Sequence, residues 1–397
     1  MPGTKDAVIV DAVRSPMGKG KKGGALSGLH AVELLAQTLA GIVDRTGIDP
    51  GAVDDVIIGC VSQGGEQAAT PGRQAWLAAG YPEHVPATTI DRRCGSSQQA
   101  LHFAVQGVMA GAYDFVLAGG VESMSRVPMG SARMGADVYG PSVTERYAPG
   151  MISQGVAAEL VAARWRLGRE EMDAYSARSH TRAAAVAGAG GFANEIVPIR
   201  VPDRDAPVTA DETIRAGTTR TKLAGLTCAF EDPAIAGRFP EISWSVTAGN
   251  SSQITDGAAA VLVVSAERAS ALGLRPRARV TATAVVGDDP VAMLTAPIPA
   301  TRCVLDRAGL DIGDIDAVEV NEAFASVPLA WQAEFGIDEE RLNPAGGAIA
   351  LGHPLGASGA RLFATLLNHL ERTGGRWGLQ VMCEAGGMAN ATVIERL

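Results

Sequence analysis

Residues 44–60 read DRTGIDPGAVDDVIIGC and residues 306–322 read DRAGLDIGDIDAVEVNE, and the two stretches align without a gap. Seven positions are identical. Each stretch reads as the end of a helix, a glycine-bearing turn and a strand of alternating Val and Ile. The pair predicts one half-domain that occurs twice, with coincidence as the alternative for a single match.

The sequence after each copy extends this repeat. Each copy continues into a turn rich in glycine or serine, then an amphipathic helix, then an apolar strand. In the first copy these lie at 93–99, 100–109 and 115–119, and in the second at 352–358, 359–370 and 379–382. Alternating strands and helices with short turns predict a mostly parallel sheet covered by helices, so we expect two such α/β halves packed together.

The alternation of predicted strands and helices is interrupted between the two copies. Residues 125–241 are rich in Gly, Pro, Met and Arg around one predicted helix at 169–187, with Glu170 and Glu171 in its favourable first turn. So large an insertion predicts a lid or ligand-binding subdomain, with a purely structural insertion as the alternative. The expected limits are 1–124 for the N-terminal half, 125–245 for the inserted loop domain, 246–274 for the completion of the N-terminal half and 275–397 for the C-terminal half.

Composition excludes several classes of function. The chain has 397 residues, of which 47% are hydrophobic, and a formal charge of -9. Nucleic-acid binding needs clustered Lys and Arg, which this charge disfavours. The first ten residues lack the apolar core of a secretory signal, and no stretch approaches the roughly 18 apolar residues of a membrane helix. We expect a soluble cytoplasmic protein with no nucleic-acid or membrane partner.

The five cysteines are odd in number and widely spaced, without a CxxC pair or a zinc-like Cys/His spacing. We expect free thiols in a reducing compartment. A free cysteine is most often a small buried hydrophobic residue, and the apolar contexts of Cys60 and Cys303 favour that structural role.

Cys94 is different, because it lies where a predicted strand passes into a helix, in the turn Asp91-Arg92-Arg93-Cys94-Gly95. The positive end of the helix and two arginines should lower the pKa of the thiol and raise the thiolate fraction. The context therefore predicts a nucleophile, with a buried structural thiol as the alternative.

The glycine-rich stretch 343–359, NPAGGAIALGHPLGASG, holds His353 at its centre. By the repeat, His353 and Cys94 occupy nearly equivalent turns, so the two halves can bring them to one interface. A histidine beside a thiol can act as its general base. The other five histidines lack such a context and are interpreted as surface or packing residues.

A second thiol, Cys383, leaves an apolar strand for a glycine turn at 385–387. Asn321 and Glu322 end the repeated strand, and an amide there can position a water or stabilise a developing oxyanion. Strand ends are favoured site positions in parallel sheets, although Asn and Glu there often only cap the next helix.

Five of these stretches, in this order, resemble the thiolase family over essentially the whole chain. They are the cysteine turn at 91–97, VTAGNSS at 246–252, NEAF at 321–324, GHPLGASG at 352–359 and Cys383 before glycines. The likeness implies a duplicated, five-layered α/β/α/β/α fold with a loop domain inserted after the first half. It also implies that the chain makes or breaks the carbon-carbon bond of a 3-ketoacyl-CoA.

The thiolase likeness further implies a role for each site residue. Cys94 would be the acylated nucleophile, His353 the base that activates it, and Cys383 the acid/base at the substrate α-carbon. Asn321 would hold a water that forms one oxyanion hole with His353, and the backbone amides of Cys94 and Ala385 would form the other.

Coenzyme A would be a substrate, and the likeness implies no metal and no permanently bound or redox cofactor. Arg215 would contact the nucleotide end of CoA and Ser252 its pantetheine arm. The family likeness also suggests a homodimer or a homotetramer, with CoA thioesters as the small-molecule partners.

Three positions depart from the family pattern. Asp91 stands where many thiolases have asparagine, Ser97 replaces a glycine, and Ala385 replaces the first glycine of the Cys-x-Gly-x-Gly turn. An alanine resists positive φ, so a turn that needs such a backbone at position 385 would distort the second oxyanion hole.

Three alternatives stay open at this point. The loop 125–150 should line the acyl pocket and resembles degradative, actinobacterial-type thiolases, which favours cleavage over the biosynthetic joining of two acetyl-CoA molecules. A decarboxylating ketoacyl synthase would pair its thiol with two histidines or a histidine and an asparagine, whereas this chain offers Cys383. A catalytically silent subunit that binds CoA or lipid is supported only by Ala385.

Overall fold

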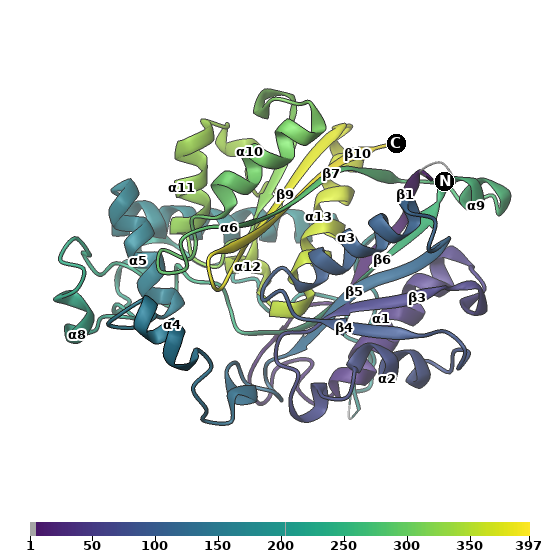
Figure 1. The fold of residues 1–397 in the computed structure, drawn as a ribbon, viewed down its shortest axis with the longest axis horizontal. Helices are drawn as coiled ribbons and strands as arrows, with labels where there is room; N and C mark the ends of the chain where they lie inside the picture. The colour runs from purple at the N-terminus through teal and green to yellow at the C-terminus, as the bar shows by residue number, and fades with distance from the viewer. Residues whose placement is uncertain (1–4, 203) are drawn as a thin grey trace.

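The computed structural model describes residues 5–202 and 204–397, and the chain is built from two similar halves (Figure 1). The two aligned stretches have the same structure. Helix α1 (Ala31–Thr46) ends at Gly47 with φ 66°, and α10 (Pro297–Ala308) ends at Gly309 with φ 65°. Each left-handed glycine leads through a short 3-10 turn to a strand. The second strand, β8 (Ala317–Val320), begins 262 positions after β3 (Asp55–Gly59).

The strands form one sheet in the order β4-β3-β5-β6-β1-β7-β10-β9-β8, with β2 paired to β6. The two halves meet at β1 and β7, through the pairs Val8–Arg279 and Ile9–Ala278. The remaining strands are β1 (Ala7–Arg14), β2 (Gly18–Lys19), β4 (Ala87–Ile90), β5 (Phe115–Ser123), β6 (Thr255–Ser265), β7 (Ala278–Gly287), β9 (Trp377–Glu384) and β10 (Met388–Arg396).

The prediction of a mostly parallel sheet was wrong, because the sheet is mixed. Among the strands of the described residues, β3–β4, β3–β5 and β8–β9 are parallel, and the other neighbouring pairs are antiparallel. The link from β9 to β10 shows the reason. Only residues 385–387 separate these strands, and so short a turn joins antiparallel neighbours, since a parallel connection needs a long crossover.

The helices complete five layers, as the family likeness implied. α1 and α2 (Pro71–Ala78) cover the outer face of the first half, and α10 and α11 (Ser326–Phe335) cover that of the second. α3 (Ser96–Met109) and α13 (Ser358–Thr373) pack against each other between the two halves of the sheet (Figure 1). Their approach is close at Gly359, where any Cβ would overlap the backbone of Gln98.

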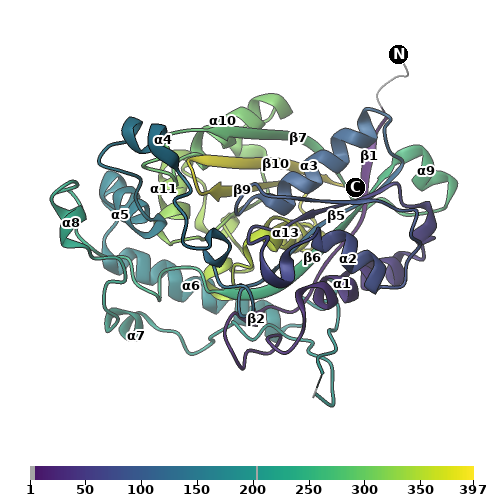
Figure 2. The same ribbon diagram turned by 60° about the horizontal axis from the view of Figure 1, so that its bottom comes forward.

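The insertion carries α4 (Gly140–Arg146), α5 (Gln154–Trp165), α6 (Arg169–Gly188), α7 (Arg220–Ala224) and α8 (Pro233–Ala236), which gather at one end of the molecule (Figure 2). The predicted helix at 169–187 is confirmed as α6. The sequence pattern did not predict α5, because this alanine-rich helix has little difference in polarity between its faces. In the structure α5 packs on α11. Short helices α9 (Ala266–Ala271) and α12 (Ala348–Leu351) complete the α-helices of the described residues.

Glu322 ties the insertion to the C-terminal half. Its buried carboxylate accepts hydrogen bonds from Tyr175 Oη at 2.8 Å and Ser179 Oγ at 2.8 Å, both on α6. It also accepts the Ile349 N–H at 2.9 Å, at the start of the segment that leads to His353. Across the described ranges, no helix is both long and apolar enough to span a bilayer.

Candidate active site

Cys94 lies in the turn between β4 and α3 and is only 5% exposed. Asp91 shapes the turn, because its carboxylate accepts the Arg93 N–H at 2.6 Å while Arg93 adopts a left-handed φ of 49°. Ser96 closes the turn by donating its hydroxyl to the Arg93 carbonyl at 2.6 Å. The aspartate that departs from the family pattern therefore has a structural role here.

The expected low pKa of Cys94 was wrong. Burial raises the pKa of this thiol well above its usual value, and the negative charges of an ionised Cys383 and Glu384 raise it further. Arg93 is exposed and Arg92 is half-buried, and neither is among the groups that shift the pKa of Cys94. A buried thiol of this kind is protonated at neutral pH, so it needs a base to become a nucleophile.

Three distant segments converge on Cys94. Its side chain belongs to a small buried cluster with Leu355 and Leu362, from the His353 loop and α13, and with Met382 of β9. Cys383 follows Met382, and its charge acts on the pKa of Cys94, so the two thiols lie within electrostatic range. The structure thus brings the cysteine turn, the His353 loop and the end of β9 together.

Cys383 is buried beside Asn321 at the ends of the parallel strands β9 and β8. The Asn321 Nδ2 lies 3.9 Å from the Cys383 Sγ, within the range of a hydrogen bond to sulfur. Burial raises the pKa of Cys383 to about 12, and the Asn321 contact offsets part of this rise. The Asn321 Oδ1 is buried without a hydrogen-bond partner in the described part of the chain, so it is available to a water or a substrate.

His353 is buried and held as a neutral imidazole. Burial, and secondarily the Arg361 cation, lowers its pKa to about 3. Its Nδ1 lies 2.6 Å from the Ser358 Oγ, and the Ser358 hydroxyl donates to the Pro354 carbonyl at 3.0 Å. Because that hydroxyl has one proton, the Nδ1 must be the donor in the first contact. The Nε2 then carries the free lone pair, and it has no partner within the described residues.

Ser358 therefore selects the tautomer of His353 that can act as a base. Ser358→Ala should lower kcat roughly 10- to 100-fold, because the Nδ1–H loses its acceptor and the other tautomer becomes accessible. Steady-state kinetics checks this, with Ser358→Thr as the matched control because it keeps the hydroxyl. Equal losses in both variants, or none in Ser358→Ala, would contradict the tautomer argument.

The sequence did not reveal Glu122, which fixes the His353 loop from the first half. The carboxylate of Glu122 accepts N–H groups from Val61 at 3.0 Å, Ser62 at 3.0 Å and Gly356 at 2.9 Å. It also accepts the Gln67 amide at 2.9 Å. A single Glu at the end of an apolar strand carries no signal of these long-range partners, although the position matches Glu384 in the repeat.

The two positions assigned to CoA lie near the strand-end segment. Arg215 is exposed and donates to the Gln253 side chain at 2.8 Å. Ser252, the neighbour of Gln253, is half-buried and donates its backbone N–H to the Ala323 carbonyl at 2.9 Å. Arg215 and Ser252 are therefore linked through Gln253 to the segment that follows Asn321.

The two other departures from the family pattern are accommodated. The Ser97 hydroxyl accepts the Ala360 N–H at 2.9 Å and so links α3 to α13. In the turn after Cys383, Gly386 has φ 90° and Gly387 has φ 74°, whereas Ala385 is not among the residues with positive φ. Ala385 therefore needs no backbone conformation that an alanine resists, and the only support for a silent subunit is removed.

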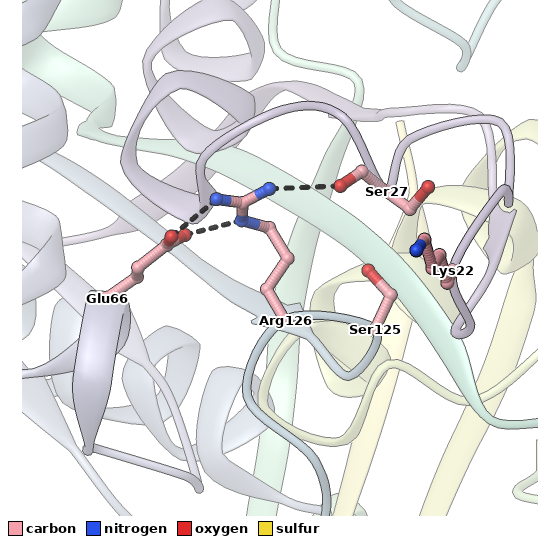
Figure 3. Close-up of a pocket in the computed structure, with 5 residues that line it drawn as sticks. All are labelled: Lys22, Ser27, Glu66, Ser125 and Arg126. Carbon is pink, nitrogen blue, oxygen red and sulfur yellow. Dashed lines mark hydrogen bonds and ion pairs between the residues drawn. The ribbon is translucent and has the colours of Figure 1, made fainter.

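A separate surface pocket of about 310 Å³ is lined by Lys22, Ser27, Glu66, Ser125 and Arg126 (Figure 3). The Arg126 guanidinium lies between the Glu66 carboxylate, at 2.6 Å from its Nε, and the Ser27 carbonyl, at 3.0 Å from its Nη1. The pocket is open and polar, and its arginine is already paired. It contains none of the residues predicted to act in catalysis.

Comparisons with known proteins match almost the whole length of the chain. The model of the thiolase N-terminal domain matches residues 7–267, and that of the thiolase C-terminal domain matches residues 274–396. Steroid 3-ketoacyl-CoA thiolase FadA6 of Mycobacterium tuberculosis is 50% identical, with 99% of this chain and 94% of that protein covered. The 3-ketoacyl-CoA thiolase of Serratia proteamaculans is 44% identical, with 99% and 100% covered.

Among solved structures, the acetyl-CoA acetyltransferase of Bacillus anthracis matches with a TM-score of 0.89 and 37% identity over 100% of both chains. Matches of this extent cover both halves, the insertion and every segment that converges on Cys94. The chain belongs to the thiolase family and is an acyltransferase.

Proposed function

We propose that the chain cleaves 3-ketoacyl-CoA with free CoA, giving acetyl-CoA and a shortened acyl-CoA through an acyl-Cys94 intermediate. The observation that carries the proposal is that the segments of two buried thiols and of a neutral, buried imidazole with a free Nε2 meet in one buried cluster. The reaction needs two proton-handling groups and one nucleophile, and this site offers that set.

In the first half-reaction, His353 Nε2 takes the proton of the Cys94 thiol, and the sulfur adds to the 3-keto carbon. The bond between C2 and C3 breaks, and its electron pair forms the enolate of acetyl-CoA. Cys383 gives its proton to C2, which its pKa of about 12 permits because the thiol is protonated at neutral pH. Acetyl-CoA leaves, and the shortened acyl group remains on Cys94 as a thioester.

In the second half-reaction, free CoA gives its thiol proton to the Cys383 thiolate and attacks the acyl-Cys94 thioester. The bond from the carbonyl carbon to the Cys94 sulfur breaks, and His353 returns its proton to that sulfur. Both half-reactions place negative charge on a carbonyl oxygen. The backbone amides of Cys94 and Ala385 would stabilise one such oxygen, and His353 with a water on Asn321 the other.

Coenzyme A acts here as a substrate. We assign its nucleotide end to Arg215, which is exposed and cationic, and its pantetheine arm to Ser252, which is bonded to the segment that follows Asn321. Arg215 lies within the insertion 125–245 and Ser252 lies just after it, which supports the proposal that this segment is a CoA-binding domain added to the first half.

The direction and substrate follow from the relatives and the loop 125–150. Proteins named as 3-ketoacyl-CoA thiolases, one of them for steroid substrates, are 44–50% identical, whereas the acetyl-CoA acetyltransferase is 37% identical. We therefore propose cleavage of substrates larger than acetoacetyl-CoA, with biosynthetic condensation of acetyl-CoA as the alternative.

The test is thiolysis of acetoacetyl-CoA, a medium-chain 3-ketoacyl-CoA and a 3-ketoacyl-CoA with a fused-ring side chain, with kcat/KM measured for each. Our proposal predicts at least a tenfold preference for one of the larger substrates over acetoacetyl-CoA. A preference for acetoacetyl-CoA would favour the biosynthetic alternative, and CoA binding without any turnover would favour a silent subunit.

We propose a homodimer or homotetramer as the working form. The loop 125–150 exposes apolar side chains that a second copy or an acyl chain would cover, since Met134 is 91% exposed and Met129 58%. Light scattering of the purified chain should give a mass of two or four copies, and a strictly monomeric active enzyme would contradict this assignment.

A further inference from the structure

Glu384, the last residue of β9, has a direct counterpart in the first half. The strand pairs β3–β5 and β8–β9 have matching registers, because Ile58 pairs with Gly119 and Val320 pairs with Val381, each 262 positions later. The same offset relates Glu122 to Glu384 and Cys94 to Gly356. The carboxylate at the end of β5 in the first half is therefore repeated at the end of β9 in the second.

The two carboxylates differ in their hydrogen bonds. Glu122 is fully paired, and one of its donors is the Gly356 N–H of the opposite half, at 2.9 Å. Repetition would pair Glu384 with the N–H of Cys94. Both carboxylate oxygens of Glu384 are instead buried without a hydrogen bond of normal geometry to any described residue.

Glu384 lies directly against the cysteine turn. A Cβ placed on Gly95 would overlap the Glu384 Oε1, so the carboxylate lies against the backbone that follows Cys94. It also acts electrostatically on both thiols, because its ionised form raises the pKa of Cys94 and of Cys383. Glu384 is therefore an acid without a hydrogen bond of normal geometry, packed against the cysteine turn, whose charge acts on both thiols of the proposed mechanism.

The charged and polar groups around Glu384 only partly offset the effect of burial on its pKa. Burial raises the pKa of its carboxyl to about 8, and Asp91 raises it slightly, whereas the Arg92 guanidinium and the Asn390 N–H lower it. The two thiols, Cys94 and Cys383, are the other titratable groups that it affects. Its charge therefore changes within the pH range in which the enzyme would work.

We propose that Glu384 is a positioning residue that sets the acidity of Cys94, permitting the thiolate while its carboxyl is protonated and opposing it once ionised. The proposal rests on Cys94 as the nucleophile of the proposed function. Two like charges in a buried site repel strongly, so the carboxylate and the Cys94 thiolate disfavour each other. In the first half, Glu122 is held by hydrogen bonds that fix a loop. In the second half, Glu384 has no such bonds, so its carboxyl can gain or lose a proton beside Cys94.

The test is the rate at which iodoacetamide alkylates Cys94, followed at peptide level by mass spectrometry, in wild type and in Glu384→Gln. At pH 6.5, where Glu384 is protonated, the two rates should agree within about twofold. At pH 9, Glu384→Gln should react about tenfold faster, since one pKa unit corresponds to tenfold more thiolate. A ratio that is the same at both pH values would overturn the proposal, because it would reflect access to the thiol rather than charge.

The matched control is Glu122→Gln, at the equivalent position of the other half. It should lower Tm by several degrees, because four hydrogen bonds are disturbed. Glu122 also raises the pKa of Cys94, so its loss can change the alkylation rate, but by the same factor at pH 6.5 and pH 9. An acceleration in Glu122→Gln that appears only at pH 9 would contradict a role specific to Glu384. These rates report the thiol itself, so they stay informative even if thiolysis were to survive Cys94→Ala, the result that would refute the proposed function.

Thermal unfolding gives a second, independent readout. The pKa of Glu384 in the folded chain lies above its ordinary value of 4.5, so the folded state holds a proton that the unfolded state has lost. Stability contributed by this group is therefore present below about pH 4.5 and lost as the pH rises through about 8. The Tm of Glu384→Gln should exceed that of wild type increasingly over this range, and a constant difference would overturn the proposed titration.

Discussion

Cys94→Ala should lower kcat for thiolysis by at least about 10⁴-fold, the largest loss that the structure predicts for a single side chain. In the proposed mechanism the substitution removes the sulfur that carries the acyl group, while the remaining donors can still bind substrate. The measurement is the rate of acetyl-CoA release from the best 3-ketoacyl-CoA of the substrate panel. Retention of more than about a tenth of wild-type kcat would refute the mechanism.

Cys303→Ala is the matched control for that experiment. Cys303 is a half-buried thiol on α10 and packs at the edge of the outer core, away from the converging segments. Its loss should leave kcat within about twofold of wild type. Loss of activity in both variants would show that the assay reports general damage to the fold.

Cys383→Ala should lower kcat for thiolysis roughly 10³-fold while acyl exchange between an acyl-CoA and free CoA retains a larger share of its rate. Only carbon-carbon cleavage needs a proton at C2, and a positioned acid typically contributes about 10²–10⁴-fold. Exchange requires the Cys94 nucleophile, and another group or water can move the thiol proton of CoA. Acyl exchange is measured with a labelled CoA acceptor.

An equal loss of thiolysis and exchange in Cys383→Ala, with Tm unchanged, would contradict the assignment of Cys383 to the α-carbon. Cys228→Ala provides the control for removal of a thiol outside the converging segments. Cys228 donates to the Trp244 carbonyl in the insertion and should affect neither reaction by more than about twofold.

The sequence predicted the elements that depend on local chemistry. The glycines that end α1 and α10 are left-handed C-caps, so the aligned stretches revealed the duplication directly. The helix at 169–187 was visible from its acidic first turn. The direction of the strands could not be predicted in this way. Whether a strand such as β10 runs antiparallel depends on the distant strand with which it pairs, and not on its own residues.

The sequence indicated which segments come together around Cys94, but not the electrostatics of that thiol. The turn around Cys94 suggested a lowered pKa because a helix terminus contributes about 0.3–1 kcal/mol to an exposed charge. Full burial shifts a pKa by up to several units, and each unit is about 1.4 kcal/mol. The effect of burial on the pKa of Cys94 is therefore larger than that of the helix terminus. Cys94 becomes buried only when the two halves pack together, and the hydrogen-bond partners of Glu122 and Glu322 also come from distant segments. No local sequence pattern encodes these contacts.

The most direct test of the central claim is mass spectrometry of the enzyme quenched after mixing with a 3-ketoacyl-CoA in the absence of free CoA. The thioester should accumulate, because the second half-reaction lacks its acceptor. We predict that the shortened acyl group is found on the peptide that contains Cys94, in stoichiometric amounts. An acyl group on another residue, or turnover without any acyl-enzyme, would contradict the account.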